Sequence, residues 1–129
     1  MSPSRILLVD DDLLFRDGLQ TILSVQPGIE IIGEASNGEE ALNLAKSLSP
    51  DVVLMDVHMP LLDGIAATRH LKTICPLCQV IVLTTFCSID LEREAIRAGA
   101  VCLLPKDISA GELVRVIRES HCDGSPSKM

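Results

Sequence analysis

Short apolar segments alternate along the chain with longer segments that mix apolar and polar residues. The apolar runs lie at residues 5–9, 28–33, 51–55, 79–84 and 101–104. Four of them (RILLV, DVVLM, QVIVLT and VCLL) are nearly continuous in Val, Ile and Leu. Such runs are typical of strands buried on both faces of a parallel sheet, so the pattern predicts five strands in a parallel sheet.

Between these runs, apolar residues recur at helical spacing. The stripes are Phe15-Leu19-Ile22-Leu23, Ala41-Leu44-Ala45-Leu48, Ile65-Thr68-Leu71, Leu91-Ala95-Ala98 and Leu113-Val116-Ile117. Gly99 is placed to end the fourth helix and Ser109 to cap the fifth. We interpret every stripe as core packing. Strand and helix repeated five times predict an α/β, flavodoxin-like (βα)5 fold, a doubly wound parallel sheet with strand order 2-1-3-4-5.

The composition restricts the classes of function. The chain has 129 residues and is 47% hydrophobic, which suits a single domain with a real core. No apolar run reaches the roughly 18 residues that span a membrane, and no signal peptide is evident, so we expect a cytoplasmic protein without a membrane segment. The net charge of −7 argues against direct nucleic-acid binding. Residues 1–120 are predicted to form the domain, and residues 121–129 a polar tail or the start of a linker.

The cysteines favour ordinary reduced thiols. There are five, an odd number without a secretory signal. Cys75 and Cys78 form a CxxC, the spacing of many redox pairs and zinc sites. However, the pair is predicted to close a helix before a strand, whereas redox pairs normally open a helix after one. For zinc, only His121-Cys122 follows, far downstream.

Polar residues collect where the predicted strands end. Asp10-Asp11-Asp12 follow the first strand, Asp56 ends the third, Thr84-Thr85 end the fourth, and Pro105-Lys106 end the fifth. Each residue by itself is more often a solvated turn residue. In an open α/β sheet, however, the carboxyl ends of the strands border one crevice, near the point where the winding reverses. We therefore expect three carboxylates, a hydroxyl and an ammonium group to lie together.

This set of groups indicates phosphoryl-transfer chemistry. Crowded carboxylates repel one another unless a cation joins them, and Mg²⁺ prefers one or two carboxylates together with waters and a phosphate. A carboxylate such as Asp56 can act as a nucleophile and form an acyl phosphate. Lys106 and Thr84 would balance the added negative charge, and phosphoryl transfer needs mainly positioning and charge neutralisation.

These motifs resemble a response-regulator receiver domain of two-component signalling. The matching segments are LLVDDD at 7–12, VVLMDVHMPLLDG at 52–64, VIVLTT at 80–85 and LLPKD at 103–107. They are spread over residues 5–120, and as an ordered set they are highly specific. LLFRDGL at 13–19, MDVHMP and LPKD are most similar to the NarL/FixJ (LuxR-type) subfamily.

The resemblance implies a role for each residue of the crevice. Asp56 would accept a phosphoryl group from the phosphohistidine of a sensor histidine kinase. Thr84 would be the switch hydroxyl and Lys106 the phosphate-binding ammonium. The implied Mg²⁺ ligands are Asp10, Asp11, Asp56 and the backbone carbonyl of His58. Asp12 falls where the family varies and is expected to be solvated or to cap a helix.

The resemblance also implies partners and an output. In the subfamily, a receiver usually precedes a helix-turn-helix DNA-binding domain. The expected output is transcription regulation, with DNA reached only through a C-terminal domain that this sequence does not encode. A homodimer is a further family expectation. The chain would not be an enzyme beyond its own phosphorylation and dephosphorylation on Asp56.

Two positions depart from the family pattern. Leu103 stands where many receivers carry a Tyr or Phe that turns inward on activation. Lys106 is followed by Asp107 rather than by proline, so we expect a trans peptide bond there.

Two alternative functions remain open. One is a pseudo-receiver, an interaction module that is never phosphorylated. Leu103 favours it, although every acidic residue and the lysine are present. The other is an aspartate-nucleophile phosphohydrolase of the haloacid-dehalogenase type. Such enzymes usually carry a second Asp where this chain has His58, and they have a cap domain that is not encoded here.

Overall fold

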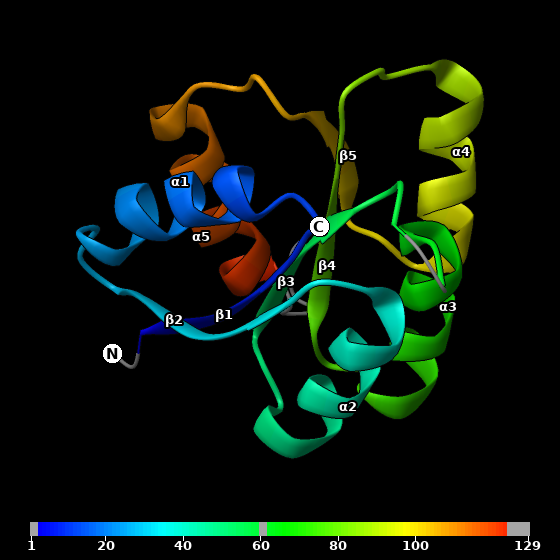
Figure 1. Ribbon diagram of the computed structural model, residues 1–129, viewed down its shortest axis with the longest axis horizontal. Coiled ribbons are helices and arrows are strands. Elements are labelled where there is room, and N and C mark those ends of the chain that lie inside the picture. The colour runs from blue at the N-terminus through cyan, green and yellow to red at the C-terminus, as the bar shows by residue number, and fades with distance from the viewer. Residues whose placement is uncertain (1–2, 60–61, 124–129) are drawn as a thin grey trace.

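One parallel sheet with helices on both faces forms the structure, a computed structural model that describes residues 3–59 and 62–123. The strands lie in the order β2-β1-β3-β4-β5 (Figure 1). They are β1 (Ser4–Val9), β2 (Ile29–Ala35), β3 (Val52–Asp56), β4 (Gln79–Thr84) and β5 (Cys102–Pro105). The helices are α1 (Leu13–Ser24), α2 (Gly38–Leu48), α3 (Gly64–Ile74), α4 (Ile89–Ala98) and α5 (Ala110–Asp123). The predicted (βα)5 fold and its strand order are confirmed.

The sheet separates two apolar cores. Helices α1 and α5 cover one face, and α2, α3 and α4 cover the other (Figure 1). Successive residues of each inner strand therefore enter opposite cores. On β1, for example, Leu7 packs with the α2–α4 side and Leu8 with the α1–α5 side. Burial on both faces explains why these strands are apolar without alternation.

Four of the five strands differ from their predicted bounds. β1 begins one residue earlier, at Ser4, and β3 is shifted by one residue to Val52–Asp56. β2 ends at Ala35 instead of residue 33 because Gly33 does not stop the strand. A Cβ at Gly33 would lie 3.1 Å from Leu48 Cδ1 and 3.3 Å from Leu7 Cδ1, so the glycine makes room for core packing. β5 is shifted by one residue and includes Pro105, which an edge strand tolerates.

The helix ends largely follow the sequence signals. Gly99 ends α4 in the left-handed region at φ 112, and Ser109 Oγ accepts a hydrogen bond from Glu112 N at 3.2 Å, as predicted. α5 continues to Asp123, so residues 121–123 of the expected tail are helical, and residues 124–129 lie outside the described chain. Within the described ranges, no helix is both long and apolar enough to span a membrane.

Candidate functional site

Three carboxylates meet where the winding of the sheet reverses, between β1 and β3. One oxygen each of Asp10, Asp11 and Asp56 lies within 4.8 Å of the other two. We call these residues the acidic cluster. Asp10 and Asp56 are buried, with exposed fractions of 3% and 4%, whereas Asp11 is exposed. The predicted convergence of these strand ends is thus confirmed.

Lys106 supplies a positive charge at the acidic cluster. Its Nζ lies 2.8 Å from Asp10 Oδ2 and 3.3 Å from Asp56 Oδ1. The Lys106 N–H donates to the Thr84 carbonyl at 2.8 Å, which fixes the start of the chain after β5. The ammonium also lies 4.6 Å from the centre of the Phe15 ring, within range of a cation–π interaction.

The electrostatics of the cluster leave negative charge uncompensated. Burial raises the pKa of the Asp56 carboxyl to about 6; the Asp10 carboxylate adds to the rise and Lys106 opposes it. Burial disfavours the charged Lys106, but its ion pairs with Asp10 and Asp56 outweigh that effect and raise its pKa. Three carboxylates face one ammonium group. This donor set fits a hard divalent cation with oxygen ligands, such as Mg²⁺.

The start of α1 holds Asp10 in place. Asp10 Oδ1 accepts a hydrogen bond from the Asp12 N–H at 2.8 Å, and the Asp10 carbonyl accepts one from Arg16 Nη1 at 2.6 Å. Asp12 caps the helix, because its Oδ1 accepts from Leu14 N at 3.1 Å and Phe15 N at 3.3 Å. The capping role considered for Asp12 is therefore confirmed.

Gly64 allows α3 to start directly against the end of β3. The Gly64 N–H donates to the Val57 carbonyl at 2.8 Å. A Cβ at position 64 would lie only 2.0 Å from the backbone oxygen of Asp56, closer than any real contact. The glycine in the DG pair at 63–64 thus sets the backbone around Asp56.

Of the two remaining predicted site residues, Thr84 is buried at the end of β4, whereas His58 is exposed after β3. Thr84 is fully buried, and its hydroxyl donates to the Phe86 carbonyl at 3.2 Å and accepts from the Phe86 N–H at 3.3 Å. The hydroxyl therefore connects β4 to the loop that follows it. His58 is exposed two residues beyond Asp56, and it lines a surface cavity with Asp63, Arg69 and other residues.

An aliphatic side chain fills the position of the family's aromatic switch. Leu103 is buried in the α2–α4 core and lines a cavity of about 270 Å³ with Cys87, Ser88, Ile89 and Glu92. The described chain contains no cis peptide bond, which confirms the expected trans bond between Lys106 and Asp107.

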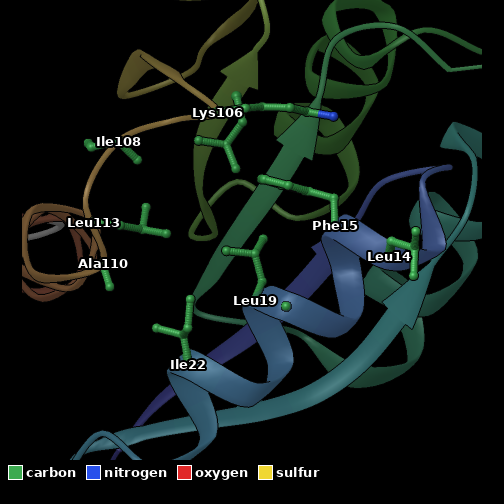
Figure 2. A pocket seen from close by; sticks show the side chains of 10 residues that line it. Leu14, Phe15, Leu19, Ile22, Lys106, Ile108, Ala110 and Leu113 are labelled. Atoms are coloured by element: carbon green, nitrogen blue, oxygen red, sulfur yellow. The ribbon is translucent and has the colours of Figure 1, made fainter.

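An apolar cavity of about 230 Å³ opens between α1 and α5, with Lys106 at its upper end (Figure 2). Phe15, Leu19 and Ile22 line it, so this stripe forms a cavity wall as well as core. Neither the cavity nor the contact of Phe15 with Lys106 was predicted from the sequence. The sequence did contain a signal in Leu14, an apolar residue outside the helical stripe, which the structure leaves 83% exposed.

The chain is similar to bacterial response regulators. The profile of the response regulator receiver domain matches residues 6–118. The chain is 46% identical over 114 residues to the transcriptional regulatory protein LiaR of Bacillus subtilis, covering 88% of this chain and 54% of LiaR. It is 42% identical over 108 residues to a protein-glutamate methylesterase/protein-glutamine glutaminase of Pseudomonas putida, covering 80% of this chain and 28% of that protein. The chain thus spans about half the length of LiaR.

Solved structures share the fold. The signal receiver domain of NarL from Mycobacterium tuberculosis superposes with a TM-score of 0.90 at 29% identity, covering 95% of this chain and 98% of that one. A CheX–CheY complex with BeF3 and Mg²⁺ from Borrelia burgdorferi gives a TM-score of 0.85 at 25% identity, covering 92% and 89%. The family match over residues 6–118 and the shared five-stranded sheet show that this chain belongs to the response regulator receiver domain family of two-component signalling.

Proposed function

We propose that this chain is a phosphoacceptor: in the presence of Mg²⁺, a phosphoryl group passes to Asp56 from the phosphohistidine of a sensor histidine kinase. The observation that carries the proposal is the position of the Asp56 carboxylate, which lies within 4.8 Å of two other carboxylates and 3.3 Å from the Lys106 ammonium. In the transfer, an Asp56 carboxylate oxygen forms a bond to phosphorus, and the phosphorus–nitrogen bond to the kinase histidine breaks.

The acidic cluster would hold the metal ion. We assign Asp10, Asp11, Asp56 and the backbone carbonyl of His58 as ligands. When bound, Mg²⁺ neutralises the carboxylates and the oxygens of the incoming phosphoryl group. The Mg²⁺ named for the CheX–CheY complex supports the choice of this metal.

Lys106 and Thr84 would respond to the phosphoryl group. The Lys106 ammonium, which bridges Asp10 and Asp56, would pair with a phosphoryl oxygen and balance its charge. The Thr84 hydroxyl would leave Phe86 and donate to another phosphoryl oxygen. Because Thr84 anchors the loop after β4, this exchange would move that loop and carry the signal toward α4 without an aromatic residue at position 103.

The output would be transcription regulation through another domain. LiaR is a transcriptional regulatory protein about twice as long as the matched region, which supports a DNA-binding domain C-terminal to this receiver. On this proposal residues 1–120 form the receiver, the segment that follows leads into a linker, and the protein works in the cytoplasm. The chain's own net charge of −7 opposes direct DNA contact. A homodimer formed on phosphorylation belongs to the same proposal.

Intact mass spectrometry tests the phosphoacceptor role. With a small-molecule phosphodonor and Mg²⁺, the wild-type chain should gain the mass of one phosphoryl group. Asp56→Asn should gain none, chelation of Mg²⁺ should prevent the gain, and Asp17→Asn, which alters an exposed residue of α1, should behave as wild type. Absence of a Mg²⁺-dependent adduct on folded wild type would favour a pseudo-receiver. Multiple turnover of a phosphomonoester would favour a phosphohydrolase.

A further inference from the structure

We propose that Cys75 and Cys78 form a redox modification site, at which a hydroperoxide converts the two thiols into a reversible disulfide. The pair lies between the end of α3 and the start of β4, at the opposite end of β4 from Thr84 and the acidic cluster. The proposal therefore does not depend on the proposed phosphoryl transfer.

A tight turn brings the two cysteines together. Cys75 is the residue that ends α3, and its carbonyl accepts a hydrogen bond from the Cys78 N–H at 3.1 Å. A four-residue turn of this kind holds its first and last Cα atoms within about 7 Å, and a disulfide spans much the same range. Pro76 occupies the second position, where its fixed φ favours the turn. Closing the disulfide thus requires little backbone movement.

The two thiols differ in their access to solvent. Cys75 is partly exposed, whereas Cys78 is fully buried, and both are free. Cys78 belongs to the α2–α4 core, and Cys75 packs against that core from the side of the solvent. Leu77, between them, is 90% exposed, so the turn lies open to solvent. An oxidant in solution would therefore reach Cys75 first, with Cys78 buried at the other end of the same turn.

Lys72 adds a positive charge and rigidity to the turn. Its Nζ donates to the carbonyls of Pro76 at 2.9 Å and Cys78 at 2.7 Å. Burial raises the pKa of Cys78 to about 12, with Cys75 adding to the rise and Lys72 opposing it. Cys78 is thus a thiol at neutral pH.

The chemistry balances with a hydroperoxide as the oxidant. The Cys75 sulfur attacks a peroxide oxygen, the O–O bond breaks, and the thiol proton goes to the leaving oxygen, so that a sulfenic acid and an alcohol or water form. The Cys78 sulfur then attacks the Cys75 sulfur, and the sulfenic oxygen leaves as water with the Cys78 proton. Two thiols are oxidised by two electrons, and the peroxide is reduced. A thiol reductant reverses the disulfide by exchange.

A zinc site fits this pair less well. Among the described residues, the grouping of three or more possible ligands is the acidic cluster, at the other end of the sheet. The cysteines thus bring two ligands, and a structural zinc ion takes four.

Thiol counting after oxidation tests the proposal on the full chain. The reduced protein is treated with hydrogen peroxide, the peroxide is removed, and the remaining thiols are alkylated under denaturing conditions. Trypsin leaves Cys75, Cys78 and Cys87 in one peptide, because no Lys or Arg stands between Lys72 and Arg93. Cys87→Ser is therefore the reference variant. Its peptide should lose two hydrogen atoms and both alkylation sites, and a thiol reductant should restore them.

Cys75→Ser is the matched loss-of-function variant, at a partly exposed position where folding can be verified by circular dichroism. It should keep Cys78 alkylatable after the same treatment, and Cys75→Ala serves if the serine variant does not fold. The proposal is overturned if Cys75 and Cys78 both stay alkylatable in Cys87→Ser while other thiols in the chain are oxidised. It is equally overturned if the disulfide found joins another pair of cysteines.

Discussion

The carboxyl group of Asp56 lies where its charge is disfavoured. It is 4% exposed, and the Asp10 carboxylate lies beside it. Lys106 offsets this only in part, since the pKa of Asp56 rises from 3.8 to about 6. Without a metal ion, ionised Asp56 therefore opposes folding.

This shift predicts a pH-dependent effect of Asp56→Asn on stability. Because the folded-state pKa of about 6 exceeds the unfolded value of 3.8, the folded protein binds more protons. The free energy of unfolding contributed by Asp56 is then present at low pH and lost as pH rises through about 6. In EDTA, the stability of Asp56→Asn relative to wild type should increase from pH 4 to pH 7 by up to about 3 kcal/mol.

Urea unfolding at the two pH values measures this difference. Asp17→Asn removes an exposed carboxylate outside the acidic cluster and serves as the control. If the stability of both variants relative to wild type changed equally with pH, the buried charge at Asp56 would not explain the effect.

Gly64 predicts a second effect at the scale of one residue. Gly64→Ala should lower the free energy of unfolding by about 1–3 kcal/mol or more, because the methyl group overlaps the Asp56 backbone oxygen. Gly18→Ala is the matched control. No atom lies within 4 Å of its added Cβ, and within α1 alanine should stabilise by about 0.5–1 kcal/mol. Thermal unfolding of both variants separates the two cases, and a neutral Gly64→Ala would contradict the close approach.

At the scale of one element, helix α1 has one face buried in the core and another exposed to solvent. Leu19 and Leu23 enter the core, whereas Leu14 is 83% exposed beside the cavity that Lys106 borders. If Asp56 accepts a phosphoryl group from a kinase, as proposed, the kinase would approach it from this edge of the sheet. We therefore expect such a kinase to contact the first turns of α1.

Leu14→Ser should slow phosphotransfer from the sensor kinase by about tenfold, since burying an exposed leucine contributes roughly 1.5–3 kcal/mol. Phosphorylation by a small-molecule donor should be unchanged, because that donor needs no contact with α1. Val25→Ser alters a residue that is 75% exposed at the other end of α1 and should affect neither reaction. Equal slowing with both donors would contradict a docking role for Leu14. The rate at which a labelled phosphoryl group passes from each donor to the chain measures both effects.

At the scale of the whole molecule, a cation should stabilise the fold. The chain carries a net charge of −7, and three carboxylates converge at one edge of the sheet. A ligand that binds only the folded state at 100 times its Kd adds about 2.7 kcal/mol. Mg²⁺ should therefore raise the free energy of unfolding, and EDTA should reverse the gain.

Asp11→Asn distinguishes binding at the cluster from general screening of charge. Asp11 is exposed, so its amide variant should fold, but it should lose most of the stabilisation by Mg²⁺. NaCl at matched ionic strength controls for screening. A gain in NaCl as large as the gain in Mg²⁺ would contradict a specific site.

Much of the architecture follows from local patterns in the sequence. Continuous apolar runs and helical stripes predicted five strand–helix units, because the burial of each element depends on its own periodicity. The rule that ligands bind at the carboxyl ends of parallel strands then brought Asp10, Asp11, Asp56 and Lys106 together. The largest departure from the predicted strand bounds is in β2, which continues past Gly33 to Ala35. The glycine does not end the strand there but makes room for Leu7 and Leu48.

Distances between elements emerged only from the tertiary structure. The pKa of Asp56 depends on burial and on Asp10, which lies on another strand. The contact of Phe15 with Lys106 joins α1 to the end of β5. The sequence favoured ordinary thiols at Cys75 and Cys78. In the folded chain, however, a backbone hydrogen bond joins the two residues in one turn, and Lys72 donates to the Cys78 carbonyl. Local periodicity determines which elements form and which face each buries, whereas these contacts depend on how close the elements pack, to within a few tenths of an ångström.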